Sequence, residues 1–322
     1  MAASNFHRTP ERGQENMQTP SSRPEPGYIL VMGMTGSGKT TFISRLTGPH
    51  TDVGVGHSLS SSTIDATAYP VLSPHPPHRP LFLIDTPGFD DTTRSDASVL
   101  ATIASTLLAL HRARRPVLGI IVLHRITDVR LAGSAVKTFR VLQRLCGPAN
   151  YDRVVLATTM WSDASFSAAG REAAAARQRR LREYWGRDDM FAGRSVVMRH
   201  AQDAGGSAWR VVEAVVALAE EEGAAGYRPL GIQVEMGERG VALEETAAGR
   251  YVMGELLEAR RAQEGELREL ERRVEEGAMV LRERKGEGGG GASSPDRVDQ
   301  LQRWFVSFWT GLRSGSWWKA AA

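Results

Sequence analysis

Residues 33–40 read Gly-Met-Thr-Gly-Ser-Gly-Lys-Thr, and this octapeptide constrains the fold of the chain more than any other segment. It fits the pattern G-x-x-x-x-G-K-[ST] in full, between a short apolar run (28–32) and a helix-like segment (39–46). Glycines let the backbone of such a loop close around a phosphate group with several N–H groups pointing inward, and the helix adds the positive end of its dipole. The sequence therefore predicts a phosphate-binding loop at the end of a buried strand.

The residue types in this loop have distinct expected roles. Lys39 is expected to reach the β- and γ-phosphates of a nucleotide, and the Thr40 hydroxyl is expected to hold Mg²⁺. The alternative is a glycine-rich turn with no ligand, which the complete motif between strand and helix disfavours. The predicted nucleotide contacts of the segment are Gly33, Met34, Thr35, Gly36, Ser37, Gly38, Lys39, Thr40 and Thr41.

Strand-like runs alternate with helix-like segments from Tyr28 to Gly223. Apolar runs such as 81–84 and 154–156 are typical of buried parallel strands, and residues 63–71 alternate like an edge strand. This order predicts an α/β fold with a mostly parallel sheet covered by helices on both faces. Because parallel strands end at one edge of the sheet, Gly33, Asp85 and Thr158 are expected to converge there.

Two further elements indicate a nucleotide protein. Residues 83–88 are a strand followed by D-x-x-G, in which Asp85 is expected to hold Mg²⁺ through water and the Gly88 N–H to sense a γ-phosphate. In the Ser-rich loop between the motifs, Thr63 is the expected switch residue that closes over Mg²⁺, with Ser62 as the alternative. The expected metal ligands are thus Thr40, Thr63 and Asp85, and the expected catalytic residues are Lys39, Thr63 and Gly88.

With these motifs the chain resembles the translation-factor-related G domains, in the group that includes septins and immunity-associated nucleotide-binding proteins. The resemblance is carried by residues 33–40, 57–63 and 85–92, and segments 119–128 and 157–161 are similar to a fungal set of G-domain proteins. It covers roughly residues 28–285. It implies a three-layer P-loop NTPase G domain that binds a guanine nucleotide, GTP or GDP, together with Mg²⁺.

The segment that selects guanine departs from the family pattern. These families carry an N/T-K-x-D box after the fifth strand, whereas residues 158–163 read Thr-Thr-Met-Trp-Ser-Asp, without a lysine and with a displaced aspartate. Thr159 and Asp163 are the predicted nucleotide contacts here. Two interpretations of Trp161 are open: it stacks on the base, or it caps the edge of the sheet.

The hydrolytic position is altered as well. Phe89 follows D-T-P-G where Ras-like proteins carry a glutamine that orients the attacking water, so slow hydrolysis is expected. One hypothesis is that a homodimer across the nucleotide face raises the rate, with Arg125 or Arg94 acting in the second chain. The alternative is that these arginines are only solvated.

Composition excludes several classes of protein. Of the 322 residues, 41% are hydrophobic, enough for a sizeable core, and the single cysteine, Cys146, excludes an internal disulfide framework. The formal charge is +3, and the arginine-rich segment 171–187 has no aromatic interleaving, so no nucleic-acid partner is expected. The longest apolar stretch, 116–123, is strand-sized. The expected location is the cytoplasm, with peripheral membrane association as an option.

Five regions are predicted along the chain. Residues 1–27 form a disordered arm, 28–223 the G domain, 224–285 a linker and charged helical extension, 286–295 a glycine-rich linker and 296–322 an aromatic amphipathic tail. The extension has near-heptad apolar spacing, so it either folds back on the G domain or pairs as a short coiled coil. The tail is expected to contact a membrane surface or a protein partner, or to pack on its own chain.

Together these features predict guanine-nucleotide binding with slow Mg²⁺-dependent GTP hydrolysis, used as a switch or assembly signal. One alternative is a nucleotide-bound scaffold that does not hydrolyse GTP and acts through its C-terminal helices. An ATP-using phosphotransferase is a third option, disfavoured because the D-x-x-G turn and the switch threonine have no obvious role in it.

Overall fold

The computed structural model describes residues 25–47, 66–71, 80–91, 93–129, 131, 133–164, 167–201, 205–221 and 228–287. The expected switch residues Thr63 and Ser62, the N-terminal arm to residue 24, and residues 288–322 lie outside the described residues.

A six-stranded sheet in the order β2-β3-β1-β4-β5-β6 forms the centre of the fold. Its strands are β1 (Gly27–Gly33), β2 (Thr67–Pro70), β3 (Leu81–Asp85), β4 (Val117–Arg125), β5 (Val154–Thr159) and β6 (Val196–Arg199). Only the edge strand β2 is antiparallel to its neighbour; the other pairs are parallel. The central strands are buried almost throughout because helices cover both faces of the sheet.

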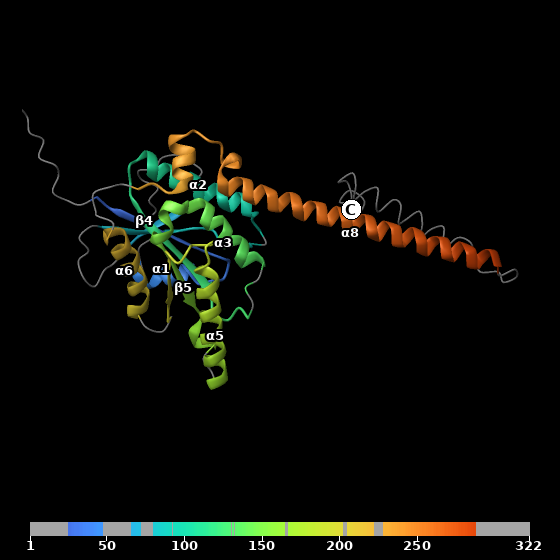
Figure 1. Cartoon of the computed structure of the whole chain (residues 1–322), viewed down its shortest axis with the longest axis horizontal. Coiled ribbons are helices and arrows are strands. Elements are labelled where there is room, and N and C mark those ends of the chain that lie inside the picture. Colours follow the sequence, from blue (N-terminus) through green and yellow to red (C-terminus); the bar gives the residue numbers. More distant parts are fainter. Residues whose placement is uncertain are drawn as a thin grey trace, which may run out of the picture. The chain divides into compact units, whose positions relative to one another are not determined.

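The two faces of the sheet carry separate apolar cores. Figure 1 shows the helices that cover the sheet. Helices α1 (Lys39–Thr47) and α6 (Gly205–Glu221) cover one face, where Phe42 and Val211 are fully buried. The other face is covered by α2 (Asp96–Arg112), α3 (Gly133–Cys146) and α5 (Ala168–Trp185), with Trp185 among the largest buried side chains. The expected three-layer α/β fold with a mostly parallel sheet is confirmed.

Shorter helical segments connect these elements. They are the 3₁₀ helix η2 (Pro148–Arg153), α4 (Trp161–Ala164), α7 (Gly231–Gln233), the π-helical turn η3 (Val234–Glu238) and the 3₁₀ turn η4 (Leu243–Glu245). Helix α8 (Ala247–Glu287) follows.

The first compact unit extends to Leu257, beyond the boundary expected near residue 223. Leu230, Ile232, Ala248 and Val252 are buried in the same core as α2 and α3. Their burial explains the longer unit, because removing this segment from the core would expose large apolar side chains to water.

The second unit begins at Glu258, and its described part is the remainder of α8. Arg272 pairs with Glu269 at 2.5 Å and also with Glu276, and Arg260 pairs with Glu264 at 2.9 Å. Such spacings stabilise an exposed helix along its own surface. Leu270 and Val274 are about half exposed, and their pairing with a second chain stays a prediction.

Among the described helices, none has both the length and the apolar character that a bilayer span requires.

Candidate functional site

The register of the sheet brings the predicted loop residues to one edge. Val31 pairs with Asp85, Gly33 with Leu123, and Arg125 with Thr159. The carboxyl ends of β1, β3, β4 and β5 therefore lie side by side, as expected from the parallel topology.

The phosphate loop follows β1 in a conformation that glycine favours. Gly33, Gly36 and Gly38 have φ values of +148°, +76° and +94°. At Gly33 an added Cβ would also lie 2.5 Å from the Leu123 carbonyl oxygen, so no larger residue fits without moving β4. Gly33 is thus required by the close approach of β1 and β4, and all three glycines suit the turn through their positive φ values.

Lys39 begins helix α1 and folds back over the loop. Its Nζ donates to the carbonyl oxygens of Gly33, at 3.2 Å, and Met34, at 3.1 Å. Burial lowers the pKa of Lys39, while the carboxylates of Asp85 and Asp91 act to raise it. The lysine is therefore a partly buried cation at the loop, positioned to exchange main-chain oxygens for phosphate oxygens.

Asp85, the last residue of β3, faces this lysine. Burial raises the pKa of Asp85, opposed by the charge of Lys39 and by hydrogen bonds from the Thr86 main chain and the Thr40 side chain. Its Oδ1 is buried and has no hydrogen-bond partner. An unpartnered carboxylate oxygen beside a hydroxyl is a donor set that suits Mg²⁺, which prefers oxygen ligands and one or two carboxylates.

Within the described residues there is no group of three or more His, Cys, Asp or Glu side chains that would hold a metal by themselves. The pair Thr40 and Asp85 therefore fits an ion that takes its other ligands from water and from phosphate oxygens, as Mg²⁺ does at nucleotide sites.

The D-x-x-G turn contacts the phosphate loop directly. The Thr35 N–H donates to the Phe89 carbonyl at 3.0 Å, and Met34 and Phe89 form an isolated bridge. An added Cβ at Gly88 would lie 2.6 Å from Thr35 Oγ1 and 2.9 Å from Lys39 Nζ. The Phe89 ring is buried in the core, which explains an apolar residue at this position and leaves it no role in orienting water.

Asp91 is a polar neighbour of the loop that the sequence analysis missed. Its Oδ2 accepts from the Thr35 hydroxyl at 3.3 Å, and its Oδ1 accepts from the Thr93 N–H at 2.8 Å. The Thr93 hydrogen bonds hold the pKa of Asp91 below its usual range. The signal was the second aspartate after D-T-P-G, but a sequence does not show which of two adjacent aspartates turns toward the loop.

The side chain of Thr159 contacts the main chain of the phosphate loop. The Thr159 hydroxyl donates to the Ser37 carbonyl at 2.9 Å, and the side chain is fully buried. This bond ties the end of β5 to the loop, so the structure places Thr159 as a support of the loop. Thr41 lies exposed in the first turn of α1, and the side chain of Asp163 is outside the described residues.

Trp161 is held at the end of the sheet. Its indole N–H donates to the Thr158 carbonyl and hydroxyl oxygens, both at 3.0 Å, and the ring packs with Ile126 and Ala174. The Arg199 guanidinium lies over the ring, 4.1 Å from its centroid. Of the two interpretations of Trp161, this geometry favours the cap of the sheet edge.

Of the two arginines suggested for a second chain, Arg125 lies next to its own phosphate loop. Its Nη1 would be 3.5 Å from a Cβ on Gly36, and its Nε pairs with Asp128 at 3.1 Å. Arg94 is exposed in the loop before α2.

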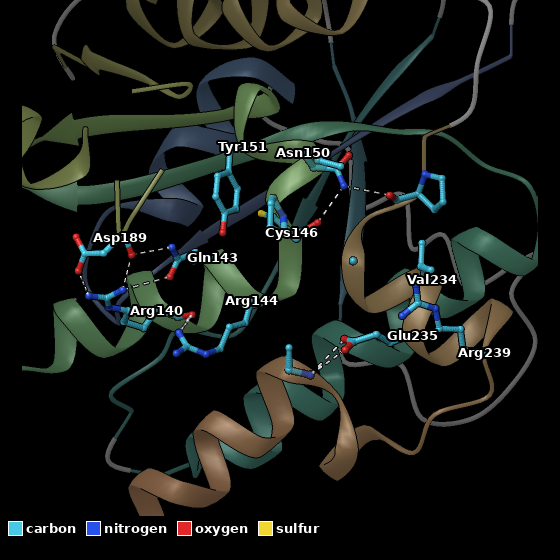
Figure 2. A pocket seen from close by; sticks show the side chains of 16 residues that line it. Arg140, Gln143, Arg144, Cys146, Asn150, Tyr151, Asp189, Val234, Glu235 and Arg239 are labelled. Carbon is cyan, nitrogen blue, oxygen red and sulfur yellow. Dashed lines mark hydrogen bonds and ion pairs between the residues drawn. The ribbon is translucent and has the colours of Figure 1, made fainter. Parts of the chain in front are cut away.

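A cavity of about 640 Å³ lies apart from these residues, between α3, η2 and the segment that leads into α8 (Figure 2). Arg140 pairs there with Asp189 at 2.6 Å, and Glu235 accepts from the Ala247 N–H at the start of α8, at 3.1 Å. None of the predicted nucleotide contacts lines this cavity.

Fold and site together define a P-loop G domain, the nucleotide-binding domain of GTPases. Residues 28–141 match the family described as MMR_HSR1, 50S ribosome-binding GTPase. The match spans the phosphate loop, the D-x-x-G turn, α2, β4 and the first part of α3. The finer resemblance to septins, immunity-associated proteins and a fungal set stays a prediction.

Several solved structures are similar to the chain at low identity. Toc33 from Arabidopsis thaliana, in complex with GDP and Mg²⁺, is 15% identical over 64% of this chain and 88% of that chain, with a TM-score of 0.45. The G domain of the T. maritima FeoB iron transporter is 17% identical over 61% and 100%, with a TM-score of 0.40. The elongation factor SelB from Methanococcus maripaludis, with a GTP analogue, is 10% identical over 62% and 34%, with a TM-score of 0.40. Among curated proteins, none matches this sequence.

Proposed function

We propose that this chain is a guanine-nucleotide switch or assembly module that hydrolyses GTP slowly in the presence of Mg²⁺. The observation that carries the proposal is the contact between the D-x-x-G turn and the phosphate loop, where Gly88 approaches both Thr35 and Lys39 Nζ. A turn in this position meets the same phosphate that the loop holds. Its conformation can therefore depend on whether the terminal phosphate is present.

Lys39 and the loop N–H groups are the proposed phosphate contacts. Binding would replace the Gly33 and Met34 carbonyls by phosphate oxygens around Nζ, and the partly buried ammonium would gain a stronger, charged partner. Thr40 and Asp85 are the proposed Mg²⁺ ligands, together with Thr63 from outside the described residues. The ion supplies positive charge against the phosphate oxygens.

Slow hydrolysis is supported by the absence of a water-orienting side chain at the position after Gly88, because Phe89 belongs to the core. Lys39 and the loop N–H groups stabilise negative charge on the transferred group, which gives a basal rate. A homodimer across the nucleotide face remains part of the proposal. If Arg125 acts in a second chain, it must first leave Asp128.

Titration of the full chain with GTP, GDP and ATP in Mg²⁺, followed by single-turnover hydrolysis at several protein concentrations, tests this proposal. We expect binding of GTP and GDP and a slow rate that rises with protein concentration. Lys39→Ala should weaken GTP binding by about 10–100-fold, the effect of losing hydrogen bonds from a charged group. Lys137→Ala is the matched control, since Lys137 is also a partly buried lysine, pairs with Asp96 at 2.9 Å and is not a predicted nucleotide contact.

Three results would change the proposal. Guanine-nucleotide binding without turnover would favour the scaffold that acts through its C-terminal helices. A preference for ATP would favour a phosphotransferase. A rate independent of protein concentration would remove the homodimer from the mechanism.

A cytoplasmic location and a membrane or protein partner for residues 296–322 complete the proposal. Deletion of this tail tests the membrane part: liposome binding that does not change on deletion would exclude a membrane contact through the tail.

A further inference from the structure

The turn that follows β5 is strained at the position where the guanine box would carry its lysine. Met160 has a φ of +60°, in the left-handed region that residues with a side chain seldom adopt. Such a conformation is unfavourable for a residue with a side chain and persists where the surroundings enforce it, often at ligand sites. Both neighbours of Met160 in the sequence are held by hydrogen bonds. Thr159 donates to the phosphate loop, and Trp161 donates to Thr158.

A second cation lies next to this turn. Arg199 ends β6, directly opposite Thr158 of β5, and its guanidinium lies 4.1 Å from the Trp161 ring centroid. Stacking on an aromatic face orients the planar guanidinium. Among the described residues no carboxylate pairs with Arg199, and the side chain is exposed, so its N–H groups are accessible to a ligand.

The order of the strands places this guanidinium on the side where a base would lie. Asp85 ends β3 and Gly88 follows it, on one side of the phosphate loop, and Arg199 ends β6, on the other. Strands are about 4.8 Å apart, so the ends of β5 and β6 lie roughly 10 and 14 Å from the end of β1. A nucleotide with its terminal phosphate near Gly88 therefore extends its base toward Thr159, Trp161 and Arg199.

We propose that Arg199, held by Trp161, reads the base and selects a 6-oxopurine at the edge where the N/T-K-x-D box is altered. An arginine fork matches the O6 and N7 acceptors of guanine, whereas adenine presents an amino donor in place of O6. Arg199 is then a specificity-determining residue and Trp161 a positioning residue. The inference rests on the proposed nucleotide binding and adds the group that distinguishes GTP from ATP.

The experiment is a calorimetric titration of the full chain with GTP, ITP and ATP in the presence of Mg²⁺. ITP keeps O6 and N7 but lacks the 2-amino group. We expect Arg199→Ala to weaken GTP and ITP binding by the same factor, about 10–100-fold, and to leave ATP binding unchanged. Arg199→Lys keeps the charge but not the planar fork, so its loss should be intermediate.

Trp161→Phe keeps an aromatic face but loses the N–H bonds to Thr158, and we expect it to reduce the GTP-to-ATP affinity ratio without changing ATP affinity. Arg179→Ala is the control, because Arg179 is an exposed arginine of α5. Thermal melts show whether each variant is folded. If Arg199→Ala is unfolded, the comparison is made with Arg199→Lys.

Two outcomes would overturn the assignment: an unchanged GTP-to-ATP ratio in both Arg199 variants, or equal losses for GTP and ATP. Either one leaves the proposed function intact, since the wild type would still bind GTP. A wild type that binds none of the three nucleotides would instead refute the proposed function itself.

Discussion

At the scale of single residues, the nucleotide edge contains two opposite charges that are partly buried. Lys39 and Asp85 face each other, and burial works against the ionised form of both. Their mutual attraction offsets part of that cost, but Asp85 keeps one buried oxygen without a hydrogen-bond partner. A site that holds unsatisfied charge in this way is less stable alone than with a ligand that completes it.

Asp85→Asn should separate stability from binding. Because the folded-state pKa of Asp85 is raised, its contribution to stability is fully present below the unfolded pKa and is lost as pH rises through the folded value. At pH 7 the partly buried, ionised carboxylate of Asp85 therefore lowers the stability of the wild type, and the neutral asparagine removes this cost. We expect the free energy of unfolding of the nucleotide-free variant to be about 1 kcal/mol higher than that of the wild type. We also expect the variant to lose the Mg²⁺-dependent part of its GTP affinity.

Thermal unfolding from pH 4 to 8 and GTP titration with and without Mg²⁺ measure these two effects. The gain in stability should shrink toward acidic pH, where the wild-type carboxyl is protonated. A variant that is less stable than the wild type at pH 7 would contradict this account of Asp85.

At the scale of elements, helix α8 is joined to the G domain through its first turn. The Thr246 hydroxyl accepts from the Gly249 N–H at 3.0 Å, and the Glu235 carboxylate accepts from the Ala247 N–H at 3.1 Å. Figure 2 shows Glu235 pointing to this end of the helix. Both contacts satisfy N–H groups that have no partner within the helix, and the carboxylate also complements the helix dipole.

Glu235→Ala should therefore destabilise the protein by about 1 kcal/mol, with increased amide exchange in the first turn of α8. Glu245→Ala is the matched control, since Glu245 is also acidic and close to the helix start but is exposed. Hydrogen exchange and denaturant unfolding provide the measurement. Equal effects of the two substitutions would show that negative charge near the helix start is sufficient and that the hydrogen bond from the Ala247 N–H to Glu235 adds no stability.

At the scale of the whole molecule, the G domain requires a segment that lies beyond the last strand and helix of the sheet. Gln233 donates to the Leu107 carbonyl at 2.8 Å, and Asn150 donates to that of Pro229 at 3.1 Å. These bonds place Leu230 and Ile232 in the core beside α2 and α3. The segment from 228 to 257 is thus part of the domain's tertiary structure.

Truncation at two points tests this boundary. A chain that ends at Leu257 should keep the stability of the G domain. A chain that ends at Gly223 should have a free energy of unfolding about 5 kcal/mol lower, because Leu230, Ile232 and Val252 are missing from its core. Denaturant unfolding and limited proteolysis compare the two chains. Equal midpoints would show that residues 228–257 pack on a domain that is already complete.

Much of the fold followed from local patterns. The buried strands 28–32 and 81–84 and the helix that begins at Lys39 were predicted from apolar runs and glycine positions, and the structure contains them. The boundary at 223 did not anticipate the longer unit. Leu230 and Ile232 lie in a short segment without helical or strand periodicity, so only their packing against α2 and α3 identifies them as core residues.

The sequence alone determined the phosphate loop, the D-x-x-G turn and the parallel order that brings them together, because these depend on spacing along the chain and on backbone sterics. Only the tertiary structure decided how individual side chains are placed at the carboxyl edge of the sheet. Thr159 supports the loop, Phe89 is buried in the core, Asp91 turns toward Thr35, and Arg199 stacks on Trp161. Those placements depend on contacts between strands far apart in the sequence, and such contacts exist only once the sheet has formed.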